Sequence, residues 1–168
     1  MFVSNFSAGN IPGSGVVSVT PCTPGDDSVT GTAQAEFIDL QGGNDVAYAG
    51  AGDDIVVAGA GNDNVYGGSG NDEVKGDAGD DLIDGGAGSD TAVYAGNKAD
   101  YAITFNSATG GYTIADQKAG VASEGTDTLS GVEFAKFADG TWSLGDTGVV
   151  AVVNTTPVPP AANHPGTL

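Results

Sequence analysis

The sequence predicts an all-β fold in which short parallel strands wind into a solenoid, followed by a small β cap. A nine-residue pattern recurs eight times without interruption between residues 22 and 93. Each unit combines glycine-rich positions with an acidic residue and, two places later, an aliphatic one. Beyond residue 93, most of the aromatic residues lie in alternating segments that are typical of strands. The repeat therefore predicts the solenoid, and the alternating segments predict the cap.

The charge balance argues against two classes of partner. The 168 residues include 22 Asp and Glu but only 4 basic residues, all lysine, for a net charge of -18. Nucleic acids and anionic membranes are both bound through basic surfaces. No apolar run approaches the length of a membrane span. We therefore expect a soluble chain with no nucleic-acid partner and no membrane insertion.

Residues 1–21 carry little pattern. They begin MFVSNFSAGNIPGSG, which lacks the basic and apolar stretches of a cleavable signal peptide. The stretch 15–20, GVVSVT, predicts an edge strand beside the repeats. The single cysteine, Cys22, leaves no internal disulfide to hold the fold together.

The repeat is clearest from Leu40, where its nine positions are numbered places one to nine. The six units read LQGGNDVAY, AGAGDDIVV, AGAGNDNVY, GGSGNDEVK, GDAGDDLID and GGAGSDTAV. Place four is always glycine. Place six is always aspartate: Asp45, Asp54, Asp63, Asp72, Asp81 and Asp90. Two earlier units, CTPGDDSVT and GTAQAEFID, keep the register with Asp27 and Glu36 at place six.

Each unit predicts a turn followed by a short strand. Glycine allows tight turns with positive φ, and the last three places alternate outward, inward and outward. Two units form one turn of the solenoid, so residues 18 apart stack about 4.8 Å from each other. The place-six side chains then form two columns along opposite edges: Asp45, Asp63 and Asp81 on one, and Asp54, Asp72 and Asp90 on the other.

These columns predict a bound cation. Stacked carboxylates repel one another, and one aliphatic residue per strand makes too thin a core to offset that repulsion. Carboxylate and carbonyl oxygens suit Ca²⁺, which accepts six to eight of them in irregular geometry, whereas Mg²⁺ loses its waters reluctantly. One Cys and one His offer no site for a soft metal.

The units resemble a known family. GGSGNDEVK has the form G-G-x-G-x-D-x-U-x and resembles the RTX, or haemolysin-type, calcium-binding nonapeptide repeats of secreted bacterial proteins. The resemblance covers residues 22–93 and is strongest over 40–93. It implies a calcium-stabilised parallel β-roll in which each ion lies between two loops 18 residues apart. The unit with Gln34 and Glu36 departs from the pattern at places four and six.

The resemblance also implies which oxygens hold each ion. One loop contributes the carbonyls of places two and four with its carboxylate, and the next contributes those of places one and three with its own. Four ions would use Gln41, Gly43 and Asp45 with Ala58, Ala60 and Asp63; Gly50, Gly52 and Asp54 with Gly67, Ser69 and Asp72; Gly59, Gly61 and Asp63 with Gly76, Ala78 and Asp81; and Gly68, Gly70 and Asp72 with Gly85, Ala87 and Asp90. Two tentative sites, for an upper total of six, would use Thr23, Gly25 and Asp27 with Leu40, Gly42 and Asp45, and Thr32, Gln34 and Glu36 with Ala49, Ala51 and Asp54.

Residues 94–145 predict the cap. Two alternating strands flank a loop at 107–111, a short strand follows at 132–137, and a turn at Asp139 and Gly140 leads to a last strand at 142–144. A solenoid leaves its last turn open, so we expect this region to cover it with its own small core. The run GTDTLSGVEFAKFADG resembles the segment that follows the repeats in many such proteins. The alternative is an independent β module. Residues 146–168 predict a linker or tail.

Some outward places are apolar. Val46, Tyr48, Tyr66 and Leu82 would lie on the outer face of one sheet. Cover by the N-terminal segment or by the hairpin is one explanation, and docking of a partner or of another copy is the other.

No catalytic motif is recognisable, and we expect no enzymatic activity. Acidic pairs such as Asp53 and Asp54 recur through the repeat, which favours a structural role over glycoside hydrolysis. Two functions remain. The first is a calcium-binding module of a protein secreted by the type I route, folded by extracellular Ca²⁺. The second is a calcium-dependent structural or adhesive subunit at the cell surface or in a matrix or filament.

Overall fold

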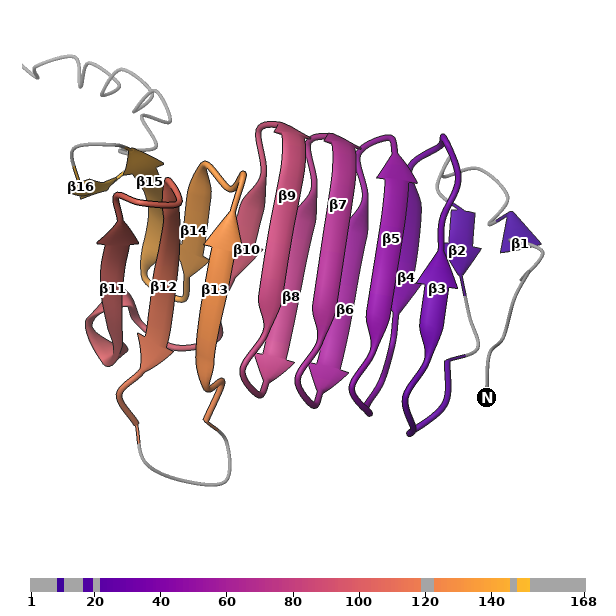
Figure 1. The fold of residues 1–168 in the computed structure, drawn as a ribbon, viewed down its shortest axis with the longest axis horizontal. Helices are drawn as coiled ribbons and strands as arrows, with labels where there is room; N and C mark the ends of the chain where they lie inside the picture. The colour runs from indigo at the N-terminus through magenta and orange to yellow at the C-terminus, as the bar shows by residue number, and fades with distance from the viewer. Residues whose placement is uncertain (1–8, 11–16, 20–21, 119–122, 146–147, 152–168) are drawn as a thin grey trace, which may run out of the picture.

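The computed structural model describes residues 9–10, 17–19, 22–118, 123–145 and 148–151. Its regular structure is β throughout these residues, apart from one 3-10 turn at Lys98–Asp100. Stacked parallel coils form a solenoid of about four turns, and antiparallel strands follow it (Figure 1). The expected fold class is confirmed.

Two facing parallel sheets form the roll. One contains β3 (Ser28–Thr30), β5 (Val46–Ala51), β7 (Asn64–Gly70) and β9 (Leu82–Gly88). The other contains β4 (Glu36–Asp39), β6 (Ile55–Ala60), β8 (Glu73–Ala78) and β10 (Thr91–Val93). Each strand pairs in parallel with the strand 18 residues later, as Ala47 does with Val65 and Val65 with Ile83. The predicted period of two units per turn is therefore confirmed.

The core of the roll is thin and mostly made of small aliphatic side chains. From Ala47 on, the place-eight residues are 0–1% exposed, namely Ala47, Val56, Val65, Val74, Ile83 and Ala92, and Leu40, Ala49 and Ala58 add buried side chains at place one. Because such short side chains bury little apolar area, the hydrophobic stabilisation of each turn is small.

Close stacking of the backbone explains the glycine at place four. Gly61 has a φ of 140°, and a Cβ at this position would lie 1.7 Å from the carbonyl oxygen of Gly43 in the preceding turn. Place two also turns through positive φ, and here Gln41 (72°) and Asp77 (67°) adopt it without being glycine. An L side chain can occupy the left-handed region at a modest cost, but it cannot overlap a neighbouring backbone atom.

The cap continues both sheets of the roll. A hairpin of β11 (Tyr101–Asn106) and β12 (Gly111–Asp116) leads to β13 (Thr126–Ser130), which pairs in parallel with β9. On the other side β14 (Phe134–Phe137) pairs in parallel with β10 and then turns back as β15 (Gly140–Gly145). The strand ladders of both sheets therefore run unbroken from the roll into this region.

Aromatic side chains fill the cap. Tyr94 and Tyr101 have ring centroids 5.1 Å apart, and Phe137 contacts both at 5.3 and 5.1 Å. Trp142 meets Phe137 edge to face at 5.5 Å. Such contacts bury far more apolar area per residue than the alanines and valines of the roll.

Short strands extend the second sheet at both ends. β1 (Gly9–Asn10) pairs with β2 (Val17–Val19), and β2 pairs in parallel with β4. The strand expected at 15–20 thus corresponds to β2, while residues 15, 16 and 20 lie outside the described residues. The expected linker needs one correction, because β16 (Gly148–Ala151) pairs with the otherwise open edge of β15. The expectation for 152–168 falls outside the described residues.

Candidate metal centre

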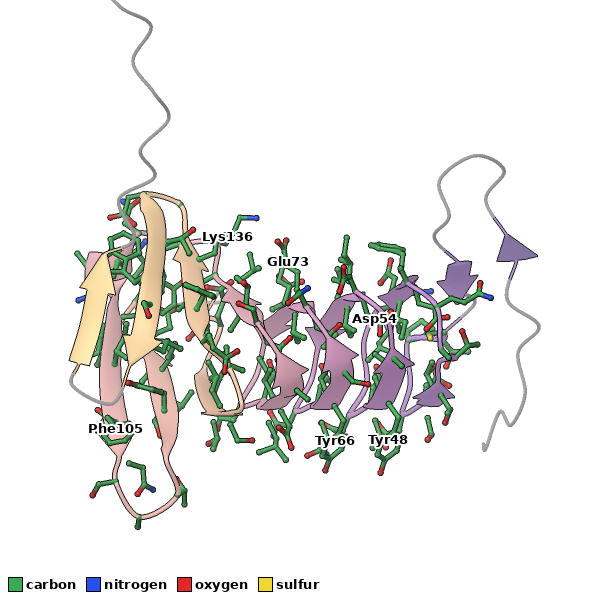
Figure 2. All side chains as sticks on the ribbon, turned by 90° about the horizontal axis from the view of Figure 1, so that it is seen from above. Tyr48, Asp54, Tyr66, Glu73, Phe105 and Lys136 are labelled. Carbon is green, nitrogen blue, oxygen red and sulfur yellow. The ribbon has the colours of Figure 1, made fainter. Side chains whose placement is uncertain are left out.

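Two columns of buried carboxylates run along the edges of the roll, one at each junction between its sheets. The six place-six aspartates are only 0–3% exposed: Asp45, Asp54, Asp63, Asp72, Asp81 and Asp90. Asp54 is labelled in Figure 2, where it lies within the roll. The repeat therefore places charged groups where water scarcely reaches them.

One oxygen of each carboxylate accepts a hydrogen bond from the backbone of the preceding turn. The backbone N–H of Asp45 donates to Oδ1 of Asp63 at 2.7 Å, and that of Asp63 donates to Oδ1 of Asp81 at 2.8 Å. On the other edge the N–H of Asp54 donates to Oδ1 of Asp72 at 2.8 Å, and Asp72 is bonded to Asp90 in the same way. These bonds hold every side chain in the same orientation.

The second oxygen is left unpaired. Oδ2 of all six aspartates is buried and accepts no hydrogen bond from the residues that the structure describes. Burying a carboxylate oxygen without a partner is costly. Burial accordingly raises the pKa of Asp54 to about 7 and that of Asp81 to about 6, with repulsion from neighbouring carboxylates adding to the effect. These oxygens have the surroundings expected of groups that bind a cation.

Backbone carbonyls lie close to the unpaired oxygens. The point where a Cβ on Gly67 would lie is 2.4 Å from Oδ2 of Asp72 and 2.7 Å from the carbonyl oxygen of Gly85. A place-six carboxylate and a place-one carbonyl of the following loop thus lie close to the same point. Within the described ranges no three His, Cys, Asp or Glu side chains gather to hold a metal by themselves. A cation here would need carbonyl ligands, and this all-oxygen donor set fits Ca²⁺.

The other expected carbonyl ligands already take part in the ladder between turns. The carbonyl of Gln41 accepts from the N–H of Ala60 at 3.1 Å, and that of Ala60 accepts from Gly43 at 2.8 Å. The carbonyls of Ser69 and Ala78 accept similar bonds, at 2.8 Å each. A carbonyl oxygen has two lone pairs, so binding an ion would use the second one.

The place-one residues divide the roll into two groups. At Gly67, Gly76 and Gly85 a Cβ would lie only 2.2–2.8 Å from Oδ2 of the aspartate of the same loop. Leu40, Ala49 and Ala58 instead bury a side chain at this place, each 0% exposed. The last three units therefore pack backbone without a side chain against the carboxylate, whereas the three before them carry a buried side chain at place one.

The first turn differs from the others at its carboxylates. Oδ2 of Asp27 accepts hydrogen bonds from the N–H of Thr23 at 2.6 Å and from its hydroxyl at 3.0 Å. Glu36 accepts from the N–H of Thr32 at 3.0 Å and from its hydroxyl. At the two tentative sites, Asp27 and Glu36 thus lack the unpaired oxygen of the six inner aspartates.

Two carboxylates of the cap continue the columns, although the nine-residue repeat does not predict them. The N–H of Asp81 donates to Oδ1 of Asp127 at 3.1 Å, and that of Asp90 donates to Oε2 of Glu133 at 2.8 Å. Burial, with repulsion from Asp81 adding to it, raises the pKa of Asp127 to about 8. A sequence signal exists, because residues 125–129 read GTDTL and match places four to eight of a unit.

The outward apolar residues lie on the sheet of β5 and β7. Tyr48 and Tyr66 stack with centroids 4.9 Å apart, and Tyr48 is 48% exposed. Figure 2 shows both on one outer face, with Glu73 and Lys136 on the opposite face. The hairpin β11–β12 extends this sheet at its edge and does not lie over β5 and β7 (Figure 1).

Comparison with known proteins agrees with this geometry. The model of the RTX calcium-binding nonapeptide repeat (4 copies) matches residues 23–47, 30–65 and 57–92. A search of curated proteins found no match to the chain. None of the described helical segments has the length and apolarity to cross a membrane. The sequence pattern, the stacked turns and the columns of buried aspartates agree with this match. Residues 23–92 of this chain are therefore RTX calcium-binding nonapeptide repeats.

Proposed function

We propose that the chain is a secreted, non-catalytic module whose roll folds when it binds extracellular Ca²⁺. The observation that carries the proposal is the set of six buried Oδ2 atoms without a hydrogen-bond donor among the described residues. A calcium ion bound between successive loops would neutralise these oxygens and link each turn to the next.

The charge of the repeat region makes the ion necessary for folding. Residues 22–93 contain 15 acidic residues and a single lysine, Lys75. Mutual repulsion therefore favours an expanded chain when no cation is bound. The thin core of the roll gives only limited compensation.

The expected binding energy is comparable with the stability of a whole domain. Extracellular calcium modules bind with Kd values on the order of 10⁻⁴ M. At about 2 mM Ca²⁺ each such site would stabilise the folded state by roughly 1.8 kcal/mol, and four sites by about 7 kcal/mol. Typical domains are stable by about 5–15 kcal/mol, so calcium would decide whether the roll folds.

Calcium-dependent folding suits the export route that the family resemblance implies. In type I secretion the chain passes outward unfolded, and calcium outside would then fold it and prevent its return. The match to RTX repeats and the acidic composition support this part of the proposal.

Circular dichroism during a calcium titration tests the proposal. We expect a β spectrum to appear cooperatively at millimolar Ca²⁺, to disappear on addition of EGTA, and to remain weak with equimolar Mg²⁺. A β spectrum of equal strength in EGTA and in calcium would contradict calcium-driven folding.

A structural or adhesive subunit is the second candidate, favoured by the exposed tyrosine stack. Tyr48 and Tyr66 form a flat aromatic surface on a regular sheet, which could pack against another copy. Sedimentation at millimolar calcium distinguishes the two functions. A secreted module should remain a monomer, whereas a subunit should form large assemblies that Tyr48→Ser with Tyr66→Ser dissolves.

A further inference from the structure

We propose a further calcium site at the junction of roll and cap, formed by Asp90, the carbonyl of Gly131 and the carboxylate of Glu133. The site rests on the proposed function, because it would take the same cation. It lies beyond the repeats, since the RTX match ends at residue 92 and the sites expected from the pattern end at Asp90.

The cap supplies the turn that follows Asp90. β14 pairs in parallel with β10, so that Phe134 lies beside Thr91. The N–H of Phe134 donates to the carbonyl of Asp90 at 2.9 Å, just as the N–H of Thr91 donates to that of Asp72 at 2.8 Å. The chain thus returns after more than 40 residues to the register that a further repeat would have occupied.

Glu133 takes the position of a place-six aspartate in this turn. Its Oε2 accepts from the N–H of Asp90 at 2.8 Å. One turn earlier, Oδ1 of Asp90 accepts from the N–H of Asp72 at the same distance. The column of carboxylates therefore gains one more member from the cap.

The oxygen arrangement beside Asp90 matches that beside Asp72. The point where a Cβ on Gly85 would lie is 2.8 Å from Oδ2 of Asp90 and 2.2 Å from the carbonyl oxygen of Gly131. The corresponding point on Gly67 lies 2.4 Å from Oδ2 of Asp72 and 2.7 Å from the carbonyl oxygen of Gly85. Gly131 thus replaces the place-one residue of a repeat loop.

A purely structural role for Glu133 does not account for Asp90. Glu133 satisfies the N–H of Asp90, but Oδ2 of Asp90 is buried and has no hydrogen-bond donor among the described residues. More negative charge lies nearby, since a Cβ on Gly131 would be 3.2 Å from Oδ1 of Asp84. A cation at the junction would pair with Oδ2 of Asp90 and offset the nearby negative charge of Asp84. It would also link the cap to the last turn of the roll.

The substitution Glu133→Gln tests the site. Glutamine has nearly the volume of glutamate and keeps an acceptor for the N–H of Asp90, but it removes the charge. We expect native mass spectrometry at saturating calcium to count one ion fewer than in the wild type. The control is Glu73→Gln, which makes the same charge change at a half-exposed side chain on the outer face of β8, where Glu73 pairs with Lys136. This variant should bind as many ions as the wild type.

The thermal midpoint at saturating calcium gives a second readout with a definite sign. If a cation is bound, Glu133→Gln lowers the midpoint or prevents folding, while Glu73→Gln does neither. If none is bound, removing the charge beside Asp90 relieves repulsion and leaves the midpoint equal or higher. An unchanged ion count with an equal or higher midpoint would overturn the junction site. A wild-type chain that binds no calcium would instead refute the proposed function itself.

Discussion

The buried carboxylates of the first turn and those of the inner turns of the roll differ in their hydrogen bonds. In the first turn, the second carboxylate oxygens of Asp27 and Glu36 are bonded to Thr23 and Thr32 at place two of their own loops. In the inner turns Oδ2 of each aspartate is unpaired among the described residues. A threonine at place two thus satisfies internally the oxygen that elsewhere would bind an ion.

The residue at place two also determines the shape of the loop. Gly50, Gly59, Gly68 and Gly86 occupy this place with φ between 94° and 115°, and a glycine carries no hydroxyl. Neither Thr23 nor Thr32 is among the described residues with positive φ. Glycine at place two therefore shapes the loop and also removes the hydroxyl donor that would compete with a cation.

Removing charge from the inner turns should have the largest effect. Asp63→Asn with Asp72→Asn takes one carboxylate from each of the four expected sites but keeps an acceptor for the bonds from Asp45 and Asp54. We expect loss of most of the roughly 7 kcal/mol that four ions contribute, and therefore loss of the calcium-induced β spectrum. A matched pair on the outer surface, Asp39→Asn with Glu73→Gln, should fold normally. An unaltered titration of the inner-turn variant would show that these aspartates are not ligands.

In calcium-free buffer, acid should stabilise the inner turns. The folded-state pKa of Asp54 is raised to about 7, that of Asp81 to about 6 and that of Asp127 to about 8, each chiefly by burial. The folded state therefore binds more protons than the unfolded chain, so stability is present at low pH and declines as pH rises through these values. Circular dichroism in metal-depleted buffer should therefore show more β structure at pH 5 than at pH 8. Asp54→Asn should reduce this difference, and more β structure at pH 8 than at pH 5 would contradict it.

Changing the first turn should have the smallest effect. Thr23→Val keeps the shape of the side chain but removes the hydroxyl that donates to Asp27. We expect a loss of about 1 kcal/mol in the free energy of unfolding at saturating calcium, with the number of bound ions unchanged. Chemical denaturation and native mass spectrometry measure the two quantities. A gain of one ion would indicate that Asp27 becomes a ligand once its hydroxyl partner is removed.

The nine-residue pattern was enough to predict the parallel roll, its 18-residue register and the inward position of every place-eight residue. These features depend on local periodicity, which a sequence displays directly. Asp127 and Glu133 were missed as members of the columns because they lie 46 and 43 residues after the aspartates that they follow. An interval of that length, occupied by a hairpin, carries no periodic signal of where the chain returns.

The repeating strands and the two columns of acidic residues follow from which residue types recur at which spacing. The stacking of the turns, by contrast, settles which carboxylate oxygens find a hydrogen-bond donor and which remain unpaired. That outcome depends on contacts between neighbouring loops and, at the last turn, on strands that the cap brings back from far along the chain. Such contacts exist only once the turns are stacked.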